Sequence, residues 1–365
     1  MRIIHRYLLK EFLAAFLLSA FVLTLVMTLG NIIFLVGLII TKGVPIMMIF
    51  KLLLYSLPSS VQFIIPISIM AGLLLSLGRL SSDNEIISIR SSGMNMARII
   101  APLLVLGLIF TSFSFLINDR VTPTAHLKNR VIVKDLGTKN PAAILEPGIF
   151  INAFDKYVLF VYEINGNKFR NIRIYEPMGE GKPPRTIIAK RGEFIALPEE
   201  NILKLKLIDG TADEIDTNNP SNFYKINFHT YFMTLDFAAN KPKHGLGKKA
   251  KDMTLKELWA KILDLRSRKF NADPIASEFH KRIAISFSPM IFFLLGIPIG
   301  IITRRREKTA NIVVAFLIVG VYFILMLCVE ALCSQGNLAP SSGMWIPNII
   351  FGILGIYLSG KLCVF

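Results

Sequence analysis

The sequence predicts an α-helical polytopic membrane protein, with six transmembrane helices and an inserted all-β jellyroll-like domain. Three observations lead to this prediction. The mean hydropathy of the 365-residue chain is +0.55, and 53% of its residues are hydrophobic. Six stretches of membrane-spanning length lack Asp, Glu, Lys, Arg and His, and between the third and the fourth the apolar pattern becomes that of short strands.

The six uncharged stretches are long enough to be transmembrane helices, because about 20 apolar residues cross the hydrocarbon core of a bilayer. The first stretch is too long for the apolar core of a signal peptide, and we expect it to be retained. The predicted spans lie within Leu13–Thr41, Leu52–Gly78, Ile99–Asn118, Ile283–Thr303, Thr309–Val329 and the second half of Ala331–Gly360.

Basic residues in the short loops predict the orientation. They precede the first span and fill the turn between spans four and five, whereas the loop after span five has no charge. By the positive-inside rule, both termini are cytoplasmic and the long segment after span three is exported. The net charge of +16 is partly this topology signal, so we expect no nucleic-acid partner. The basic residues concerned are Arg2, Arg6, Lys10, Arg304, Arg305, Arg306 and Lys308.

Residues 1–118 thus hold the first three spans, with a polar loop, Arg79–Arg98, between the second and the third. Ser82 and Glu85 have the spacing of a capping box, and Gly93 is a typical helix stop, so we expect a short helix near residues 82–92. Such a helix is too short to be stable alone and needs a surface to dock against. It is the best candidate contact for a soluble partner, although an ordinary capped turn on the membrane surface fits the spacing equally well.

Residues 119–252 are predicted to form the exported β-domain. About eight short apolar runs, with Asn165-Gly166 and Asp209-Gly210 as turn signals, suit a sandwich or jelly roll. The inward face stays open, because a one-residue slip in register reverses every side chain. The strand candidates include Tyr157–Glu163, Asn171–Glu176, Ile187–Ala189, Phe194–Leu197, Ile202–Leu207, Tyr224–Phe228 and Phe232–Leu235.

Residues 253–272 are predicted to form an amphipathic connecting helix, and residues 273–365 hold spans four to six. Thr254 and Glu257 form a second capping-box pattern, and Leu258, Trp259 and Ile262 follow at helical spacing. We expect this helix to lie close to the membrane.

Catalytic motifs are absent. The sequence has no phosphate-binding P-loop, no H-E-x-x-H and no G-x-S-x-G, and its five His residues are dispersed. Its three Cys residues lie in or beside the last spans without metal-ligand spacing. We therefore expect no catalytic residue, no metal site and no enzyme activity.

A resemblance to a known family rests on two motifs. The loop after span two reads R-L-x-x-x-x-E-I-x-x-x-x-x-x-G from Arg79 to Gly93, and the entry to span four reads F-x-x-R-I from Phe279 to Ile283. With the order of spans and β-domain, the chain resembles the LptF/LptG permease family of lipopolysaccharide export, essentially end to end.

The resemblance implies a bacterial inner-membrane protein with the β-domain in the periplasm. Its implied partners are a second related permease, a cytoplasmic ATPase dimer, a periplasmic jellyroll protein and lipopolysaccharide. ATP and Mg would be bound by the ATPase, so this chain would carry no cofactor.

The resemblance also places candidate sites. The implied ATPase-coupling residues are Arg79, Asp83, Asn84, Glu85, Ile86, Arg90 and Gly93, with helix capping as the alternative role for Glu85. The candidate lipid-binding residues are Asn31, Phe34, Lys42 and Lys51 near the outer ends of spans one and two, and Leu159, Phe160, Phe194 and Phe228 in the β-domain.

The expected function is therefore that of a permease subunit that extracts lipopolysaccharide from the inner membrane and passes it to a periplasmic bridge. Two alternatives remain open from the residues alone. One is a membrane subunit of a different ABC system that acts mechanically on a periplasmic partner, and the other is an anchor that displays a β-domain. The sequence does not distinguish which of the two paired permeases this chain would be.

Overall fold

The computed structural model describes residues 2–42, 44–139, 148–154, 157–165, 168–176, 185–197, 202–215, 223–235, 248–303 and 308–364. The chain divides into two compact units, which are described separately below. The helical unit comprises Met1–Ile32, Leu53–Leu127 and Lys248–Phe365, and the sheet unit comprises Ile33–Leu52 and Lys128–Gly247.

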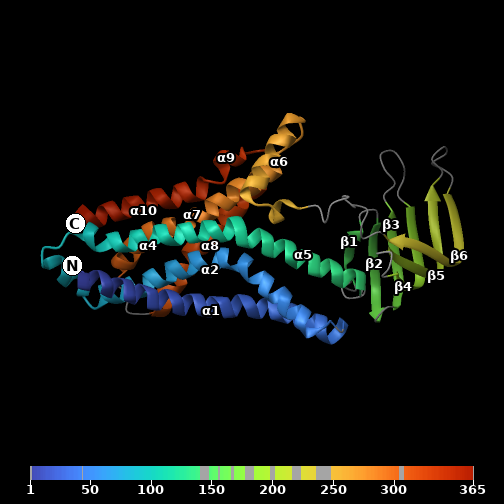
Figure 1. Cartoon of the computed structure of the whole chain (residues 1–365), viewed down its shortest axis with the longest axis horizontal. Helices are drawn as coiled ribbons and strands as arrows, with labels where there is room; N and C mark the ends of the chain where they lie inside the picture. The colour runs from blue at the N-terminus through green and yellow to red at the C-terminus, as the bar shows by residue number, and fades with distance from the viewer. Residues whose placement is uncertain are drawn as a thin grey trace. The chain divides into compact units, whose positions relative to one another are not determined.

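Helices make up the first part of the chain and the last (Figure 1). Six of the described helical segments are long and apolar enough to cross a membrane, which confirms the six predicted spans. The helices are α1 (Arg2–Lys42), α2 (Ile46–Ser82), α3 (Glu85–Ser91), α4 (Met96–Leu116), the π-helical turn η1 (Ile117–Val121), α5 (Thr122–Lys139), the 3-10 turn η3 (Ala250–Asp252), α6 (Leu255–Ser267), α7 (Asp273–Thr303), α8 (Lys308–Ser334), α9 (Pro340–Gly343) and α10 (Ile346–Val364).

The third span differs from its prediction at its far end. The segment after Asn118 was expected to enter the β-domain directly, but the helix continues through η1 and α5 to Lys139. The first charged residue, Asp119, marks where the uncharged run ends, yet a helix satisfies its own backbone hydrogen bonds in water as well as in lipid. Charge therefore located the end of the apolar run but not the end of the helix.

Helix α7 is the centre of the helical unit and packs against α4, α8 and α10. A Cβ atom added at Gly300 of α7 would lie 3.0 Å from the backbone oxygen of Leu73 in α2. Likewise, Gly107 of α4 faces the ring of Phe293, and Gly355 of α10 faces the backbone of Leu294. Small residues at these points allow the helix backbones to approach closely, which is how membrane helices gain packing energy.

The described strands form one antiparallel sheet in chain order, β1-β2-β3-β4-β5-β6. An all-β domain is thus confirmed, but the described strands form a single meander rather than the two packed sheets of a sandwich or jelly roll. The strands are β1 (Phe150–Phe154), β2 (Tyr157–Asn165), β3 (Lys168–Glu176), β4 (Arg185–Leu197), β5 (Ile202–Ile215) and β6 (Phe223–Leu235).

Among the described residues there are six strands where about eight short ones were predicted, because separate candidates merge. Ile187–Ala189 and Phe194–Leu197 belong to one strand, β4, and the two candidates near the end belong to β6. The hairpin signal at Asn165 is confirmed, since Asn165 pairs with Lys168 across β2 and β3. By contrast, Asp209-Gly210 lies inside β5 and makes no turn between strands.

The apolar face of the sheet shifts by one residue partway along the strands. In β5 the buried residues are Leu205 and Leu207 on one side of this point and Ala212 on the other, so the two-residue alternation is broken between them. In β4, Ile187 and Ala189 are buried and then Gly192, which breaks the alternation in the same way. The pairing of β4 with β5 keeps one register on both sides of the break.

The break coincides with residues in the left-handed conformation. Asn171 in β3 has a φ of 52° and Asp209 in β5 has a φ of 53°. Asn and Asp tolerate this conformation better than other residues with a Cβ. The carboxylate of Asp209 accepts hydrogen bonds from Arg191 on β4 and pairs with His229 on β6, each at 2.7 Å. Arg191, and after it His229, lowers the pKa of the Asp209 carboxyl.

The contact of Gly300 with α2 gives a test of this packing. Gly300→Val should lower the stability of the detergent-solubilised chain by about 1–3 kcal/mol, because the new side chain meets backbone rather than a movable group. Gly320→Val on α8 is the matched control, since a Cβ there has nothing within 4 Å, and it should change stability by less than about 0.5 kcal/mol. Thermal unfolding of both variants provides the comparison, and equal midpoints would contradict close packing at Gly300.

Candidate functional site

Two polar clusters lie in the helical unit, one at each end of the bundle. The terminal end holds α3 and both chain termini, and the other end, called here the α6 end, holds α6 and α9 (Figure 1). The Arg79 cluster at the terminal end consists of Tyr7, Glu11, Arg79, Asp83 and Glu85. The Arg282 cluster at the α6 end consists of Asp119, His126, Asp252, Glu278 and Arg282.

In the Arg79 cluster, three helices meet through charged hydrogen bonds. The hydroxyl of Tyr7 on α1 donates to the Glu85 carboxylate at the start of α3, at 3.0 Å. Arg79, in the last turn of α2, donates to the same hydroxyl at 3.2 Å and pairs with Glu11 of α1 at 3.0 Å. A longer contact of 3.8 Å joins Arg79 to Asp83. Glu85 and Arg79 are therefore tied to α1 rather than left free in the loop.

The start of α3 differs from the predicted capping box. Ser82 is the last residue of α2, and its hydroxyl donates back to the Arg79 carbonyl oxygen. Asn84, with a φ of 60°, precedes α3 without a side-chain cap, so capping is not the role of Glu85. The predicted stop at Gly93 is confirmed by its φ of 80°, which favours glycine.

The seven coupling candidates therefore separate into two groups. Ile86 is 7% exposed and joins the core of the helical unit, while Arg79 and Glu85 face α1. Asn84, Arg90 and Gly93 are exposed, as is the neighbouring Ile87 at 41%. Asp83 belongs to the exposed group and lies beside Arg79. One face of α3 is thus fastened to the bundle and the other is open to a partner.

The eight lipid-binding candidates are divided between the two units, and the structure describes the side chains of five of them. Asn31 is half-buried in the helical unit, whereas Lys51 is exposed on α2 in the sheet unit. The side chains of Phe34, Lys42 and Phe194 lie outside the described residues. In the sheet, Leu159 is buried in the apolar cluster and Phe228 packs against that cluster. The ring of Phe160 contacts that of Phe150 at a tilt and that of Tyr162 edge-on.

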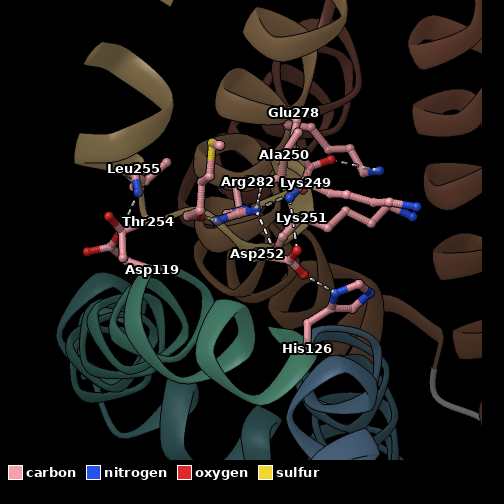
Figure 2. Close-up of polar contacts among 12 residues, drawn as sticks. Asp119, His126, Lys249, Ala250, Lys251, Asp252, Thr254, Leu255, Glu278 and Arg282 are labelled. Carbon is pink, nitrogen blue, oxygen red and sulfur yellow. Dashed lines mark hydrogen bonds and ion pairs between the residues drawn. The ribbon is translucent and has the colours of Figure 1, made fainter. Parts of the chain in front are cut away.

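In the Arg282 cluster, a buried guanidinium holds a stretch of irregular backbone (Figure 2). Arg282 of α7 is 8% exposed and donates to the carbonyl oxygens of Ala250 at 3.0 Å, Lys251 at 3.3 Å and Met253. It also pairs with Glu278, one turn earlier on α7, at 3.1 Å. The Ala250 carbonyl oxygen accepts from Arg282 in addition to the backbone nitrogen of Met253, which lies at 3.3 Å. Hydrogen bonds from a charged guanidinium are stronger than those between neutral groups.

Two further contacts fasten the same segment to the helix of the third span (Figure 2). The Asp252 carboxylate, whose side chain is fully buried, lies 2.7 Å from His126 Nδ1 of α5. The Asp119 carboxylate in η1 accepts a hydrogen bond from the backbone nitrogen of Leu255 at 2.8 Å, at the first residue of α6. A carboxylate at a helix N-terminus is favoured by the helix dipole. Nearby, the predicted capping box of Thr254 and Glu257 is confirmed.

Sequence reasoning missed most of these residues. Arg282 and Asp119 carried a usable signal, because each is the first charge beyond an uncharged run. Tyr7 and Glu11 carried none, since only the folded chain brings them to Arg79. Among the residues that the structure describes, no three His, Cys, Asp or Glu side chains are placed to hold a metal ion. The two clusters join helices to one another and to irregular backbone.

Comparison with known proteins covers almost the whole chain. Residues 6–361 match the family described as "Lipopolysaccharide export system permease LptF/LptG". The chain is 24% identical to the lipopolysaccharide export system permease protein LptF of Escherichia coli K12. The aligned 362 residues make up 98% of this chain and 94% of the relative. The Shigella flexneri protein of that name matches equally well. An uncharacterized Rickettsia prowazekii protein is 20% identical over 327 residues, 89% of each chain.

The Arg282 cluster predicts a local effect of substitution. Arg282→Met should destabilise the segment by about 3 kcal/mol or more, because three carbonyls and Glu278 lose a buried charged partner. Trypsin should then cleave after Lys249 or Lys251 much faster, since cleavage follows the population of the locally opened state.

Arg268→Met is the matched control, because Arg268 is exposed and pairs only with Asp264 in its own helical turn, at 2.9 Å. An exposed pair of this kind contributes about 0–1 kcal/mol. Equal cleavage rates in the two variants would show that Arg282 does not hold the segment closed.

Proposed function

Because this chain belongs to the LptF/LptG family of lipopolysaccharide export system permeases, we propose that it is one permease subunit of an ATP-driven transporter. It would extract lipopolysaccharide from the inner membrane and pass it to a periplasmic jellyroll bridge. The family match over residues 6–361 is the observation that carries the proposal. Three features of the structure support individual steps.

The first feature is the unequal burial of the spans, which supports pairing with a second permease. Within their most apolar windows, 78% of α2 and 61% of α7 is buried, but only 17% of α1 and 28% of α8. The outer faces of α1 and α8 carry large apolar side chains, including Phe21, Leu25, Phe316 and Leu317. Two such faces from related permeases would enclose a lateral cavity for a lipid.

The second feature is the two-sided environment of α3, which supports coupling to a cytoplasmic ATPase. Ile87 and Arg90 are open to a partner, while Ile86 and Glu85 link α3 to the bundle. A displacement of α3 would therefore be passed to α1 through Tyr7 and to α2 through Arg79. Closure of the ATPase dimer on ATP would supply that displacement and narrow the cavity.

The third feature is the apolar face of the sheet, which supports a route for acyl chains. Removing an acyl chain from the membrane into water costs about 0.8 kcal/mol for each exposed CH₂ group. Leu159, Ile174, Leu205 and Met233 belong to a continuous apolar cluster on one face of the sheet. A lipid that moved along this face would exchange one apolar environment for another.

Glu85 and Tyr7 give a paired test of ATPase coupling. Glu85→Gln should weaken co-purification of the ATPase about tenfold, because Glu85 is only partly buried against α1 and the exposed part of its carboxylate, placed against a cationic groove, contributes about 1.4 kcal/mol or more. Tyr7→Phe removes the internal hydrogen bond but keeps the carboxylate, so we expect a change of less than about threefold.

The two variants separate partner contact from internal support. Equal losses in both would mean that Glu85 acts through α1 and not on the ATPase. Normal association and transport with Glu85→Gln would remove Glu85 from the interface. Mass spectrometry of the purified wild-type chain separates the remaining alternatives. Bound lipopolysaccharide would distinguish an export permease from a purely mechanical subunit, and a bound ATPase would exclude an anchor.

Neighbouring residues of β6 test the lipid route. Tyr231 packs against the apolar cluster, while Phe232 points to the other face and is 58% exposed. A photo-crosslinking residue at Tyr231 should capture lipopolysaccharide in an ATP-dependent manner, and one at Phe232 should capture much less, since successive side chains lie on opposite faces. Equal capture at both positions would argue against the apolar face as the conduit.

A further inference from the structure

Helix α6 has two apolar sides, of which the protein covers only one. Leu258 and Ile262 are buried, and Ile262 packs with Ala272 and Ala276 at the start of α7. The residues that directly follow these two are exposed: Trp259 is 47% exposed and Leu263 is 51% exposed. One apolar side therefore attaches α6 to α7, and the second remains about half-exposed, although the ring of Phe279 lies beside Trp259.

Cations border the exposed apolar side of α6, and carboxylates lie away from it. At about 100° per residue, Trp259 and Leu263 project about 40° apart, with Arg266 and Lys256 about 20° beyond them on either side. Glu257 and Asp264 project at least about 100° away from Leu263. The exposed side thus has an apolar centre with a positive charge at each edge.

The two carboxylates of α6 are already neutralised by partners of their own. Glu257 pairs with Lys248, and this ammonium group lowers the pKa of the Glu257 carboxyl. Asp264 pairs with Arg268 at 2.9 Å. Lys256 and Arg266 are exposed, and they are the cations nearest to Trp259 and Leu263 on the helix surface. This side of α6 is complementary to a surface that is apolar inside and negatively charged at its edge.

Three spans place α6 at the boundary of the hydrocarbon core. The uncharged run of α4 ends at Asn118, and the next residue, Asp119, bonds to the first residue of α6. The uncharged run of α7 begins at Ile283, four residues after Phe279, whose ring lies 5.5 Å from that of Trp259. On α8, the first charge after the uncharged run is Glu330, which pairs with Lys281 of α7 at 2.6 Å.

The depth of Trp259 follows from these positions. Phe279 lies about 6 Å along α7 from Ile283, at 1.5 Å per residue. A polar headgroup layer is about 5–8 Å thick on each side of a hydrocarbon core of about 30 Å. Trp259 is therefore at headgroup height, where tryptophan is enriched in membrane proteins.

The direction of α6 agrees with this depth. Figure 1 shows α6 leaving the bundle sideways at an angle to α7, instead of continuing along the spans. A helix that leaves the bundle at an angle can rest one side on the membrane surface, as interfacial amphipathic helices do.

We propose that the Trp259 and Leu263 side of α6 is seated in the headgroup layer of the bilayer, where Lys256 and Arg266 bind the phosphates of bulk phospholipid. The apolar side chains enter the acyl boundary, and the two cations remain at phosphate level. Since Ile262 fastens α6 to α7 and Asp119 fastens it to η1, this contact sets the depth of the α6 end of the bundle in the membrane.

The chain itself offers a direct probe, because it contains only two tryptophans, Trp259 and Trp345. The Trp345→Phe variant leaves Trp259 as the single tryptophan and is reconstituted, full length, in nanodiscs of phosphatidylethanolamine and phosphatidylglycerol. The discs contain no lipopolysaccharide, so the result does not depend on the proposed export function. Phospholipids brominated near the top of the acyl chain, and acrylamide in the water, then serve as separate quenchers.

Brominated lipid should quench the Trp259 emission at least about twofold, and acrylamide should quench it several-fold less than an exposed tryptophan. Strong acrylamide quenching without lipid quenching would overturn the proposal, because α6 would then face water. Protection from both quenchers would also overturn it, because protein would then cover Trp259.

A charge-matched pair of double variants tests the phosphate contact in the same discs. Lys256→Gln with Arg266→Gln should reduce quenching of Trp259 by brominated lipid, because the helix loses its two phosphate contacts. Lys261→Gln with Arg268→Gln removes the same charge but should leave quenching unchanged. Lys261 projects from another side of α6, and Arg268 follows its last residue. Equal effects of the two pairs would show that net charge alone matters and would overturn the assigned contacts.

Discussion

The buried guanidinium of Arg282 is the interaction on which the α6 end of the bundle depends. It lies beside the uncharged run of α7 and donates to the carbonyl oxygens of Ala250, Lys251 and Met253, in the segment that leads into α6. Its removal would take a charged hydrogen-bond partner from all three carbonyls, which is costly wherever they are shielded from water. The position of α6, and with it the exposed Trp259, follows from this one anchor and the carboxylates of Asp119 and Asp252.

The two ends of the bundle use polar contacts differently. At the terminal end, the contacts of Arg79 are partly exposed, and each joins a helix that a partner could move. At the α6 end, Arg282 and Asp252 are buried, and their contacts resist movement. Helix α7 runs between the two ends in close contact with α2, through Gly300, and with α4, through Gly107. In the proposed cycle, force would enter at α3 while α6 keeps its level in the membrane.

Local chemistry predicted the elements well where one residue type decides the outcome. The six spans, the hairpin at Asn165, the cap of α6 at Thr254 and the stop at Gly93 all agree with the structure. The capping box at Ser82 failed because α2 continues to that residue, so that the Ser82 hydroxyl bonds within α2. The turn at Asp209-Gly210 failed because the same tolerance of positive φ that suits a turn also suits a break inside a long strand.

Local sequence patterns were enough to locate the six apolar helices and the strand-forming segment between the third and the fourth, although not the end of the helix that continues to Lys139. Hydropathy and periodicity are properties of neighbouring residues, and the bilayer acts on each apolar run separately. Which side of each element faces inward depends on the folded chain. Leu159 rather than Phe160 lies in the sheet's apolar cluster, and Glu85 bonds to Tyr7 rather than capping α3. Both outcomes depend on residues far apart in the chain. The order of neighbouring residues does not show which distant side chain packs against them.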